Sequence, residues 1–182
     1  MIKVTHLELK EVLVLEYDMK IDNRGPSYKL FSEIELEEAG IHTKFIEEIL
    51  YCPEKKGTLY GIHSQNCPKA QTKLLFCTKG RGLDFAVDLR KNSKTYKKYV
   101  SVELTPENRK QIYIPAGFGH VFLSLEDDTH VAMRIDRKFD TEYYRAIAYN
   151  DKEIGIDYPI LNPVLSERDK VAPLLKDSDC NM

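Results

Sequence analysis

The stretch LDFAVDLR, at residues 83–90, alternates apolar and polar side chains with a period of two. One face carries Leu83, Phe85, Val87 and Leu89, and the other carries Asp84, Ala86, Asp88 and Arg90. Successive side chains of a strand point to opposite faces, so this period predicts a β-strand with one buried face.

Short segments of this kind recur along the chain. Further strands are predicted at residues 11–17, 43–50, 57–65, 72–78, 96–104, 110–114, 120–125 and 129–136. Turn sequences separate them, among them NRGP, KKG, KGRG, KNS, TPEN and EDD. Many short strands with few helices indicate an all-β fold, namely a β-sandwich or β-barrel.

One short helix is predicted near SEIELEEAG, residues 32–40. Ser32 is a suitable N-cap residue, and Glu35, three positions later, would complete a capping box. Gly40 follows the last apolar position of the segment, where a glycine commonly ends a helix.

The chain of 182 residues suits a single domain, residues 1–182, with a sizeable core. From about residue 157 the sequence becomes rich in proline, and we expect an irregular segment that lies on the barrel. We expect the last residues, from about 177, to be loose.

Composition excludes several classes of function. The net charge is −2 and no block of Lys or Arg is present, which argues against nucleic-acid or membrane-surface binding. No apolar run reaches the roughly 18 residues of a membrane helix, and no signal peptide is visible. The four cysteines form no CxxC pair, so we expect reduced thiols in a cytoplasmic protein.

His63 raises the question of a metal site. PAGFGH, residues 115–120, fits the P-x-G-x-x-H pattern of the second cupin motif, with His120 as a possible ligand. The first cupin motif requires H-x-H followed by Glu, but this chain has His63-Ser64-Gln65, with Lys69 and Ala70 where the Glu would fall. Two of three first-motif ligands are missing, and a neutral amide replaces them poorly, so a metal is not expected.

Two other roles for these histidines remain open. Either could be a structural histidine in the barrel wall, and the apolar surroundings in GFGHVF favour that role for His120. Alternatively, His63 could move a proton, because histidine titrates near neutrality. That chemistry needs an orienting carboxylate and a nearby cation to stabilise an enolate, and Lys73 on the next predicted strand could be that cation.

Seven blocks of this sequence resemble the dTDP-4-dehydrorhamnose 3,5-epimerase family in order and spacing, over roughly residues 8–175. They are DNRGP (22–26), GIHSQ (61–65), QTKLL (71–75), LDFAVDLRKNSKTY (83–96), IPAGFGHVF (114–122), NDKEIGIDYP (150–159) and LSERDKVAPLL (165–175). Ordered blocks are more specific than a single motif.

The resemblance implies a cupin-type jelly roll with few short helices, usually a homodimer whose subunits exchange strands. It implies no metal and no other cofactor. Members of the family invert carbons next to the C4 ketone of a nucleotide-activated 4-keto-6-deoxy sugar. A base removes the α-proton, an enolate forms, and a proton returns on the opposite face. The implied partners are a nucleotide-diphosphate 4-keto sugar and a second copy of the chain.

The motifs also imply roles for individual residues. His63 matches the catalytic base, Asp169 matches the aspartate that orients it, and Lys73 matches the lysine near the sugar ketone. Residues assigned to substrate binding are Arg24, which matches a diphosphate contact, and Tyr60, Gln65, Asp84, His120, Met133 and Arg168.

Several positions depart from the family pattern. The family reads R-G-L-H where this chain has Tyr60-Gly61-Ile62-His63, so an arginine that commonly contacts the diphosphate is replaced by Tyr60. Lys29 stands at or near an acidic position, and EEIL at 47–50 replaces a Q-D-N sequence that contacts the base.

Met133 is the most consequential departure, because it stands where the family has the tyrosine that protonates the enolate. A thioether cannot donate a proton. The proton could return from water, from His63 itself, or from a relocated tyrosine such as Tyr60. Tyr60 and His63 would face opposite ways in an ideal strand, but Gly61 could permit a bulge. The alternatives are a catalytically silent sugar-nucleotide-binding cupin and a metal-dependent cupin enzyme.

Overall fold

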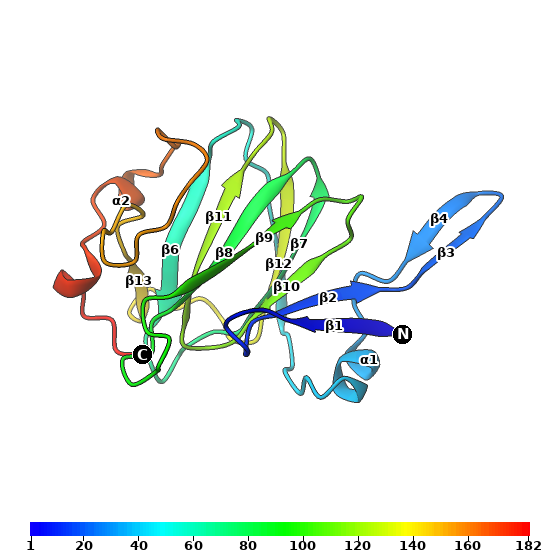
Figure 1. The fold of residues 1–182 in the computed structure, drawn as a ribbon, viewed down its shortest axis with the longest axis horizontal. Coiled ribbons are helices and arrows are strands. Elements are labelled where there is room, and N and C mark those ends of the chain that lie inside the picture. Colours follow the sequence, from blue (N-terminus) through cyan, green and yellow to red (C-terminus); the bar gives the residue numbers. More distant parts are fainter.

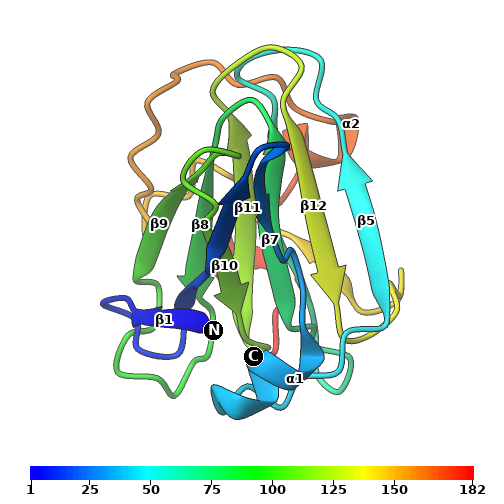
Figure 2. The same cartoon turned by 90° about the vertical axis from the view of Figure 1, so that its right-hand side faces the viewer.

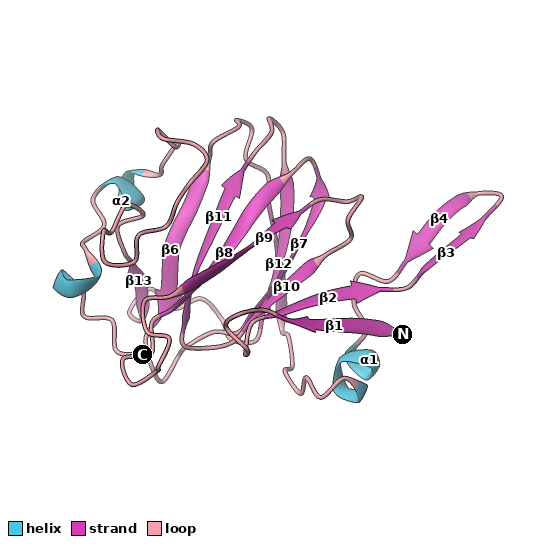
Figure 3. Cartoon of the chain, viewed as in Figure 1, coloured by secondary structure: helices cyan, strands magenta, loops and turns pink.

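The computed structural model describes residues 1–182 and consists mainly of strands, with two short α-helices (Figure 3). Two antiparallel sheets pack face to face (Figure 1). The six-stranded sheet has the order β1 (Ile2–His6), β2 (Leu13–Tyr17), β10 (Gln111–Ile114), β7 (Lys73–Lys79), β12 (His130–Ile135) and β5 (Glu47–Tyr51). The five-stranded sheet has the order β13 (Tyr144–Ala146), β6 (Leu59–Gln65), β11 (Phe118–Ser124), β8 (Gly82–Asp88) and β9 (Tyr99–Leu104). The predicted all-β sandwich is confirmed.

The main core fills the space between the two sheets. Leu75, Ile112 and Met133 enter it from the six-stranded sheet, and Val102 and Phe122 enter it from the five-stranded sheet. These side chains follow the period of two along their strands, so each strand contributes alternate residues to one core. β12 and β5 lie side by side, with β5 at the edge of the sheet (Figure 2).

Strand β8 is buried on both faces, whereas its sequence predicted one buried face. Phe85 and Val87 pack outward against the C-terminal segment, including Leu175, and not into the space between the sheets. The other face looks into the sandwich, and there Asp84 and Asp88 are fully buried. The expectation was wrong because a segment distant in sequence covers the face that a lone sheet would expose to water.

Four strands were not predicted from the sequence: β1, β13, and the hairpin strands β3 (Met19–Asp22) and β4 (Gly25–Tyr28). The hairpin projects away from the sandwich (Figure 1), and all four residues of β3 are exposed. β3 buries none of its residues and β13 is only half-buried, so the alternation that identifies other strands is absent from them. β1 does alternate, and Ile2 and Val4 pack against a small core cluster, but the predicted strand began only at residue 11.

Helix α1 (Glu33–Glu38) begins at Ser32, whose hydroxyl accepts a hydrogen bond from the backbone N–H of Glu35. The predicted capping box is only half formed, because the Glu35 carboxylate pairs with Lys29 and the backbone N–H of Ser32 donates to the Tyr17 hydroxyl at 3.0 Å. Gly40 follows the helix with φ of +80°, a conformation that favours glycine.

The C-terminal segment contains α2 (Glu167–Lys170) and a short 3₁₀ turn (Leu175–Asp177) and lies against the outer face of the five-stranded sheet. Its last residues are packed, contrary to the expectation of a loose tail. Cys180 is 1% exposed, and the backbone N–H of Asn181 donates to the Asn66 side chain at 3.0 Å. The Asn181 side chain accepts from the backbone N–H of Cys67 at 2.8 Å, so polar contacts hold the terminus in place.

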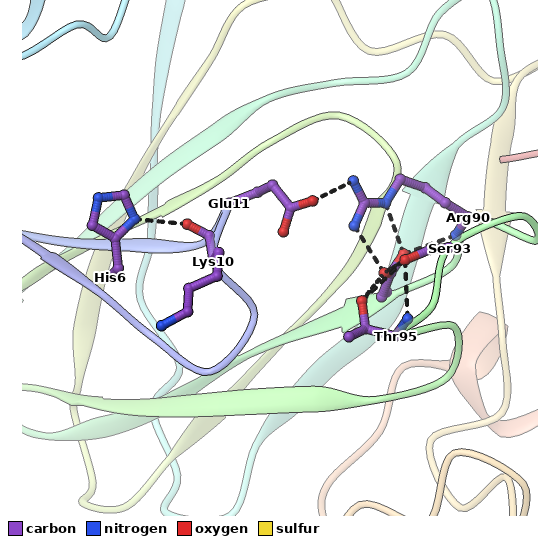
Figure 4. A network of polar contacts seen from close by, with 7 residues as sticks. His6, Lys10, Glu11, Arg90, Ser93 and Thr95 are labelled. Carbon is purple, nitrogen blue, oxygen red and sulfur yellow. Dashed lines mark hydrogen bonds and ion pairs between the residues drawn. The ribbon is translucent and has the colours of Figure 1, made fainter.

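A polar network ties the loop after β8 to the turn between β1 and β2 (Figure 4). The Arg90 guanidinium donates to the Asp88 carboxylate at 2.8 Å and to Glu11 at 3.0 Å, and the Ser93 and Thr95 hydroxyls both donate to Asp88 at 2.6 Å. Burial would raise the pKa of Asp88, but these hydrogen bonds outweigh burial and lower the pKa to about 2. The ionised carboxylate therefore holds this corner of the sandwich together.

Candidate active site

A cavity of about 200 Å³ lies between the two sheets at the end formed by β5, β6 and β13. The five-stranded sheet contributes Tyr60, His63, His120, Phe122 and Tyr144 to its lining. The six-stranded sheet contributes Tyr51, Lys73, Leu75, Val131 and Met133. The lining is mostly apolar with few polar groups, as is usual for a small-molecule site.

A bulge in β6 lets Tyr60 and His63 share the cavity. On β11, His120 pairs with His63 and Phe122 pairs with Tyr60, so two steps along β11 match three along β6. Gly61 has φ of +133°, and a Cβ there would lie 2.5 Å from the carbonyl oxygen of His120. Only glycine fits that approach, and the bulge suggested by the sequence is confirmed.

His63 and Asp169 form a hydrogen-bonded dyad. The His63 Nε2 lies 2.6 Å from Asp169 Oδ1, and the Ser166 hydroxyl donates to Asp169 Oδ2 at 2.9 Å. Asp169 is 5% exposed and stands in α2, whose N-cap is Ser166. The other ring nitrogen of His63, Nδ1, makes no hydrogen bond to the protein, so one nitrogen is held and the other is free for a ligand.

Lys73 approaches the dyad from the opposite sheet. It is 6% exposed, and its ammonium donates to the backbone carbonyl of His63 at 3.4 Å. Burial lowers the pKa of Lys73 to about 8, and the nearby Asp84 carboxylate opposes the shift only in part. At neutral pH the ammonium is therefore a poorly solvated cation, aimed at the same cavity as His63.

His120 lines the cavity and Asp84 stands behind it. His120 Nε2 lies 3.0 Å from Asp84 Oδ2, and both side chains are almost fully buried. Burial lowers the pKa of His120, which keeps the ring neutral. Asp84, predicted to contact substrate, does not line the cavity and is connected to it through His120.

Three other residues assigned to substrate binding lie outside the cavity. Arg24 stands at the turn of the projecting hairpin, paired with Asp22 at 2.6 Å. The Gln65 side-chain amide is hydrogen-bonded to backbone groups: its nitrogen donates to the Lys69 carbonyl and its oxygen accepts from the Asp140 N–H. Within one subunit, neither residue reaches the cavity, and their roles in substrate binding stay predictions.

Arg168 is the third such residue, and it contacts a tyrosine that the sequence analysis missed. Its guanidinium lies 4.8 Å from the centre of the Tyr144 ring, and the Tyr144 ring lies 5.2 Å from that of His63. Burial raises the pKa of Tyr144 to about 12, and the Asp169 charge adds to this effect. Arg168 thus supports the wall of the cavity through Tyr144 and does not line it.

Tyr51 is the second missed residue, and it faces the cavity from β5. The predicted strand at 43–50 ended one residue too early to include it. Ile49 and Tyr51 both pack against the core between the sheets, while Leu50 is 54% exposed. The alternation along this strand could have identified Tyr51 as an inward-facing residue.

Two further findings bear on the class of protein. The structure brings together no group of three or more His, Cys, Asp or Glu side chains that could hold a metal ion. Neither helix has the length and apolar character that crossing a membrane requires.

Comparisons with known proteins agree on one family. A family model described as dTDP-4-dehydrorhamnose 3,5-epimerase matches residues 6–177. The enzyme of that name from Shigella flexneri is 36% identical over 177 residues, which cover 97% of each chain. The crystal structure of the Bacillus anthracis str. Ames enzyme of that name, with TDP and PPi bound, is 33% identical with a TM-score of 0.93, covering 96% of this chain and 99% of that one.

A solved structure of an enzyme described as a monoepimerase is also similar to this chain. ChmJ, a 3'-monoepimerase from Streptomyces bikiniensis solved in complex with dTDP-quinovose, is 29% identical with a TM-score of 0.87, covering 94% of this chain and 88% of that one. The family model spans nearly the whole chain, and all seven sequence blocks lie within its matched region. The chain therefore belongs to the dTDP-4-dehydrorhamnose 3,5-epimerase family.

Proposed function

We propose that the protein is an epimerase that removes a proton next to the C4 ketone of a dTDP-activated 4-keto-6-deoxy sugar. The observation that carries this proposal is that His63, hydrogen-bonded to Asp169, and Lys73 line one cavity from opposite sheets. TDP in the similar Bacillus anthracis structure supports the choice of nucleotide.

His63 acts as the general base in this proposal. Asp169 accepts from Nε2, which leaves the lone pair on Nδ1 free to take the α-proton. Once His63 is protonated, the buried Asp169 carboxylate stabilises the imidazolium at 2.6 Å. A general base contributes about 10²–10⁴ in rate.

Lys73 stabilises the enolate that forms when the proton leaves. A cation in a poorly solvated site interacts strongly with charge that develops on the C4 oxygen. Neutral His120, held by Asp84 through Nε2, is placed to donate or accept a hydrogen bond on the sugar through its other nitrogen. The base and the enolate stabiliser are thus both present.

The cavity suits the sugar and not the whole sugar nucleotide. Its volume of about 200 Å³ is below the usual range of about 300–1,000 Å³ for larger ligands. The nucleotide would therefore extend beyond the mouth of the cavity.

A homodimer explains the projecting hairpin. A two-stranded hairpin is marginal when isolated, and Ile21 on this one is 71% exposed. We propose that the hairpin packs against a second copy and brings Arg24 to the nucleotide there, a role that Arg24 does not reach within its own subunit. Light scattering at micromolar concentration tests this, and a monomer would refute it.

The missing family acid limits the reaction. Met133 lines the cavity and has no proton to give. We propose that α-proton exchange is faster than net inversion and that inversion occurs at no more than one carbon. The similar 3'-monoepimerase shows that an inversion at one carbon exists on this fold.

We also propose a cytoplasmic location, on the ground that all four cysteines are free thiols. Reduced cysteines are usual in the cytosol.

The test of function is wash-in of solvent deuterium. The purified protein is incubated in D₂O with a dTDP-4-keto-6-deoxyhexose, and deuterium next to the ketone is followed by NMR. His63→Asn should lose exchange by about 10²–10⁴-fold while keeping its melting temperature, and Asp169→Asn should be impaired through the wrong tautomer. The matched control is His42→Asn, since His42 is exposed and lies outside the cavity.

The outcomes separate the candidate functions. A loss below about threefold in His63→Asn would remove His63 from the mechanism. Binding of the dTDP sugar without any exchange by the wild type would instead indicate a silent sugar-nucleotide-binding protein.

A further inference from the structure

Inversion requires a proton donor on the face of the sugar opposite His63. His63 stands on β6 of the five-stranded sheet, so the donor must come from the six-stranded sheet that faces it. Met133 and Lys73 reach the cavity from that sheet. Lys73 is assigned to the enolate oxygen and Met133 cannot donate, so the position of the acid is open.

Three tyrosines line the cavity, and they differ in the sheet from which they enter it. Tyr60 stands on β6, the same strand as His63, and Tyr144 stands on β13, which pairs with β6. The Tyr144 ring contacts the His63 ring at 5.2 Å, so it lies on the side of the base. Tyr51 alone comes from the facing sheet, on β5 at its edge.

Tyr51 is a diagonal neighbour of Met133. Met133 pairs with Ile49 across β12 and β5, and Tyr51 is the next residue of β5 that faces the cavity. Diagonal neighbours on one face of an antiparallel pair lie about 7–8 Å apart, within reach of an aromatic side chain. The Tyr51 hydroxyl can therefore serve the region in front of Met133.

Tyr51 is also in the chemical state that a donor needs. Burial raises its pKa, and the nearby Tyr60 adds to this effect, so the phenol keeps its proton at neutral pH. Its ring packs against that of Tyr60, with centroids 5.3 Å apart, while its hydroxyl makes no hydrogen bond to the protein. The ring is held in place and the O–H is free to meet a ligand.

We propose that Tyr51 is the catalytic acid of this chain and acts in place of the tyrosine lost at Met133, at the one carbon that is inverted. The assignment rests on the proposed epimerase function. His63 takes the α-proton as the C–H bond breaks, and the electron pair moves into the enolate. On the opposite face a new C–H bond forms as the Tyr51 O–H bond breaks, leaving a phenolate. Water then reprotonates the phenolate and takes the proton from His63, so no oxidant or reductant is needed.

The test compares exchange with inversion in the same NMR experiment. Tyr51→Phe removes only the hydroxyl and keeps the ring that packs on Tyr60. Deuterium wash-in should persist, because His63, Asp169 and Lys73 are intact, while the ratio of inverted product to deuterated starting sugar should fall by about 10²-fold or more. The control is Tyr113→Phe, whose hydroxyl bonds Thr43 outside the cavity at 2.8 Å and should leave the ratio unchanged.

A second variant keeps the proposal testable if Tyr51→Phe loses affinity. Met133→Tyr in the Tyr51→Phe background places a phenol on the same sheet face and should restore inversion. Tyr60→Phe and Tyr144→Phe are measured alongside. The assignment is overturned if exchange and inversion fall together in Tyr51→Phe and Met133→Tyr does not rescue inversion. It is also overturned if Tyr60→Phe or Tyr144→Phe, and not Tyr51→Phe, lowers the ratio of inverted product to deuterated starting sugar. Absence of wash-in by the wild type would instead refute the proposed function itself.

Discussion

Replacing Lys73 by methionine should make the protein more stable while abolishing its chemistry. Lys73 is almost fully buried, and burial lowers its pKa from 10.5 to about 8. Holding the charged side chain in the fold therefore costs about 3 kcal/mol at pH 7. Methionine has a similar shape and no charge, so Lys73→Met removes that cost.

The expected gain is smaller than the full cost. The variant loses the hydrogen bond from the Lys73 ammonium to the His63 carbonyl, which at 3.4 Å contributes about 1 kcal/mol. The net increase in the free energy of unfolding is then about 2 kcal/mol, or a melting temperature about 4–8 °C higher for a chain of this size.

The stability difference between Lys73→Met and the wild type should depend on pH. Below about pH 8 the lysine is protonated in both the folded and the unfolded state, and the wild type bears the whole cost. Between about pH 8 and 10.5 only the unfolded state holds the proton, so the wild type gains stability as pH rises. The advantage of Lys73→Met should therefore shrink over this range.

Urea unfolding of both proteins at pH 7, 8.5 and 10 measures this difference, and deuterium wash-in measures the loss of enolate stabilisation. Lys79→Met is the matched control, because Lys79 stands on the same strand with an exposed ammonium paired to Asp128. It should change stability by less than about 0.5 kcal/mol. If Lys73→Met is less stable than the wild type at pH 7, or if its advantage does not change with pH, the reasoning is wrong.

Four further predictions concern separate parts of the molecule. Met133→Tyr should raise the ratio of inversion to exchange by NMR, and efficient inversion at both C3 and C5 by the wild type would contradict the proposed limit to one carbon. The purified protein should carry no stoichiometric Zn, Fe or Mn, and chelator should leave activity and melting temperature unchanged; one equivalent of metal at His63 and His120 by elemental analysis would overturn this. Gly61→Ala should destabilise the fold by more than about 1 kcal/mol in urea, because the new Cβ would clash with a carbonyl at 2.5 Å, and a neutral effect would mean that the bulge relaxes. Asp88→Asn should lose about 2 kcal/mol at pH 7, and the wild type should lose the same stability as pH falls from about 4 to about 2, a shift that urea midpoints would reveal.

The comparison of prediction and structure is clearest at the strands. Most strands of the two sheets were predicted within a few residues, because each turns alternate apolar side chains toward a buried layer. β13 and the β3–β4 hairpin were not predicted, since neither buries such a face. For β8 the predicted strand is confirmed, but the prediction of a single buried face is wrong. Alternation along a strand does not show which face meets the second sheet and which meets the C-terminal segment.

In the candidate site, too, some features could be predicted from the sequence and others only from the structure. Family motifs identified His63, Lys73 and Asp169, and the structure brings all three to one place. The motifs did not separate residues that line the cavity from those that serve it indirectly. Asp84 acts through His120, and Gln65 is used by the backbone.

By itself, the sequence determined an all-β fold and the absence of the usual first-motif metal ligands. Its resemblance to the family supplied the candidate base His63, the candidate cation Lys73 and the departure at Met133 from the family tyrosine. The fold class follows from the period of two along the strands, and the missing metal ligands follow from residue chemistry; both are local properties of the sequence. Only the tertiary structure decided that Tyr51 lines the cavity from the sheet opposite His63 and that the Tyr144 ring contacts the His63 ring from the same sheet. The reason is physical: which residues meet across a sandwich depends on strand order and register, and neither is encoded in the spacing of residues along one strand.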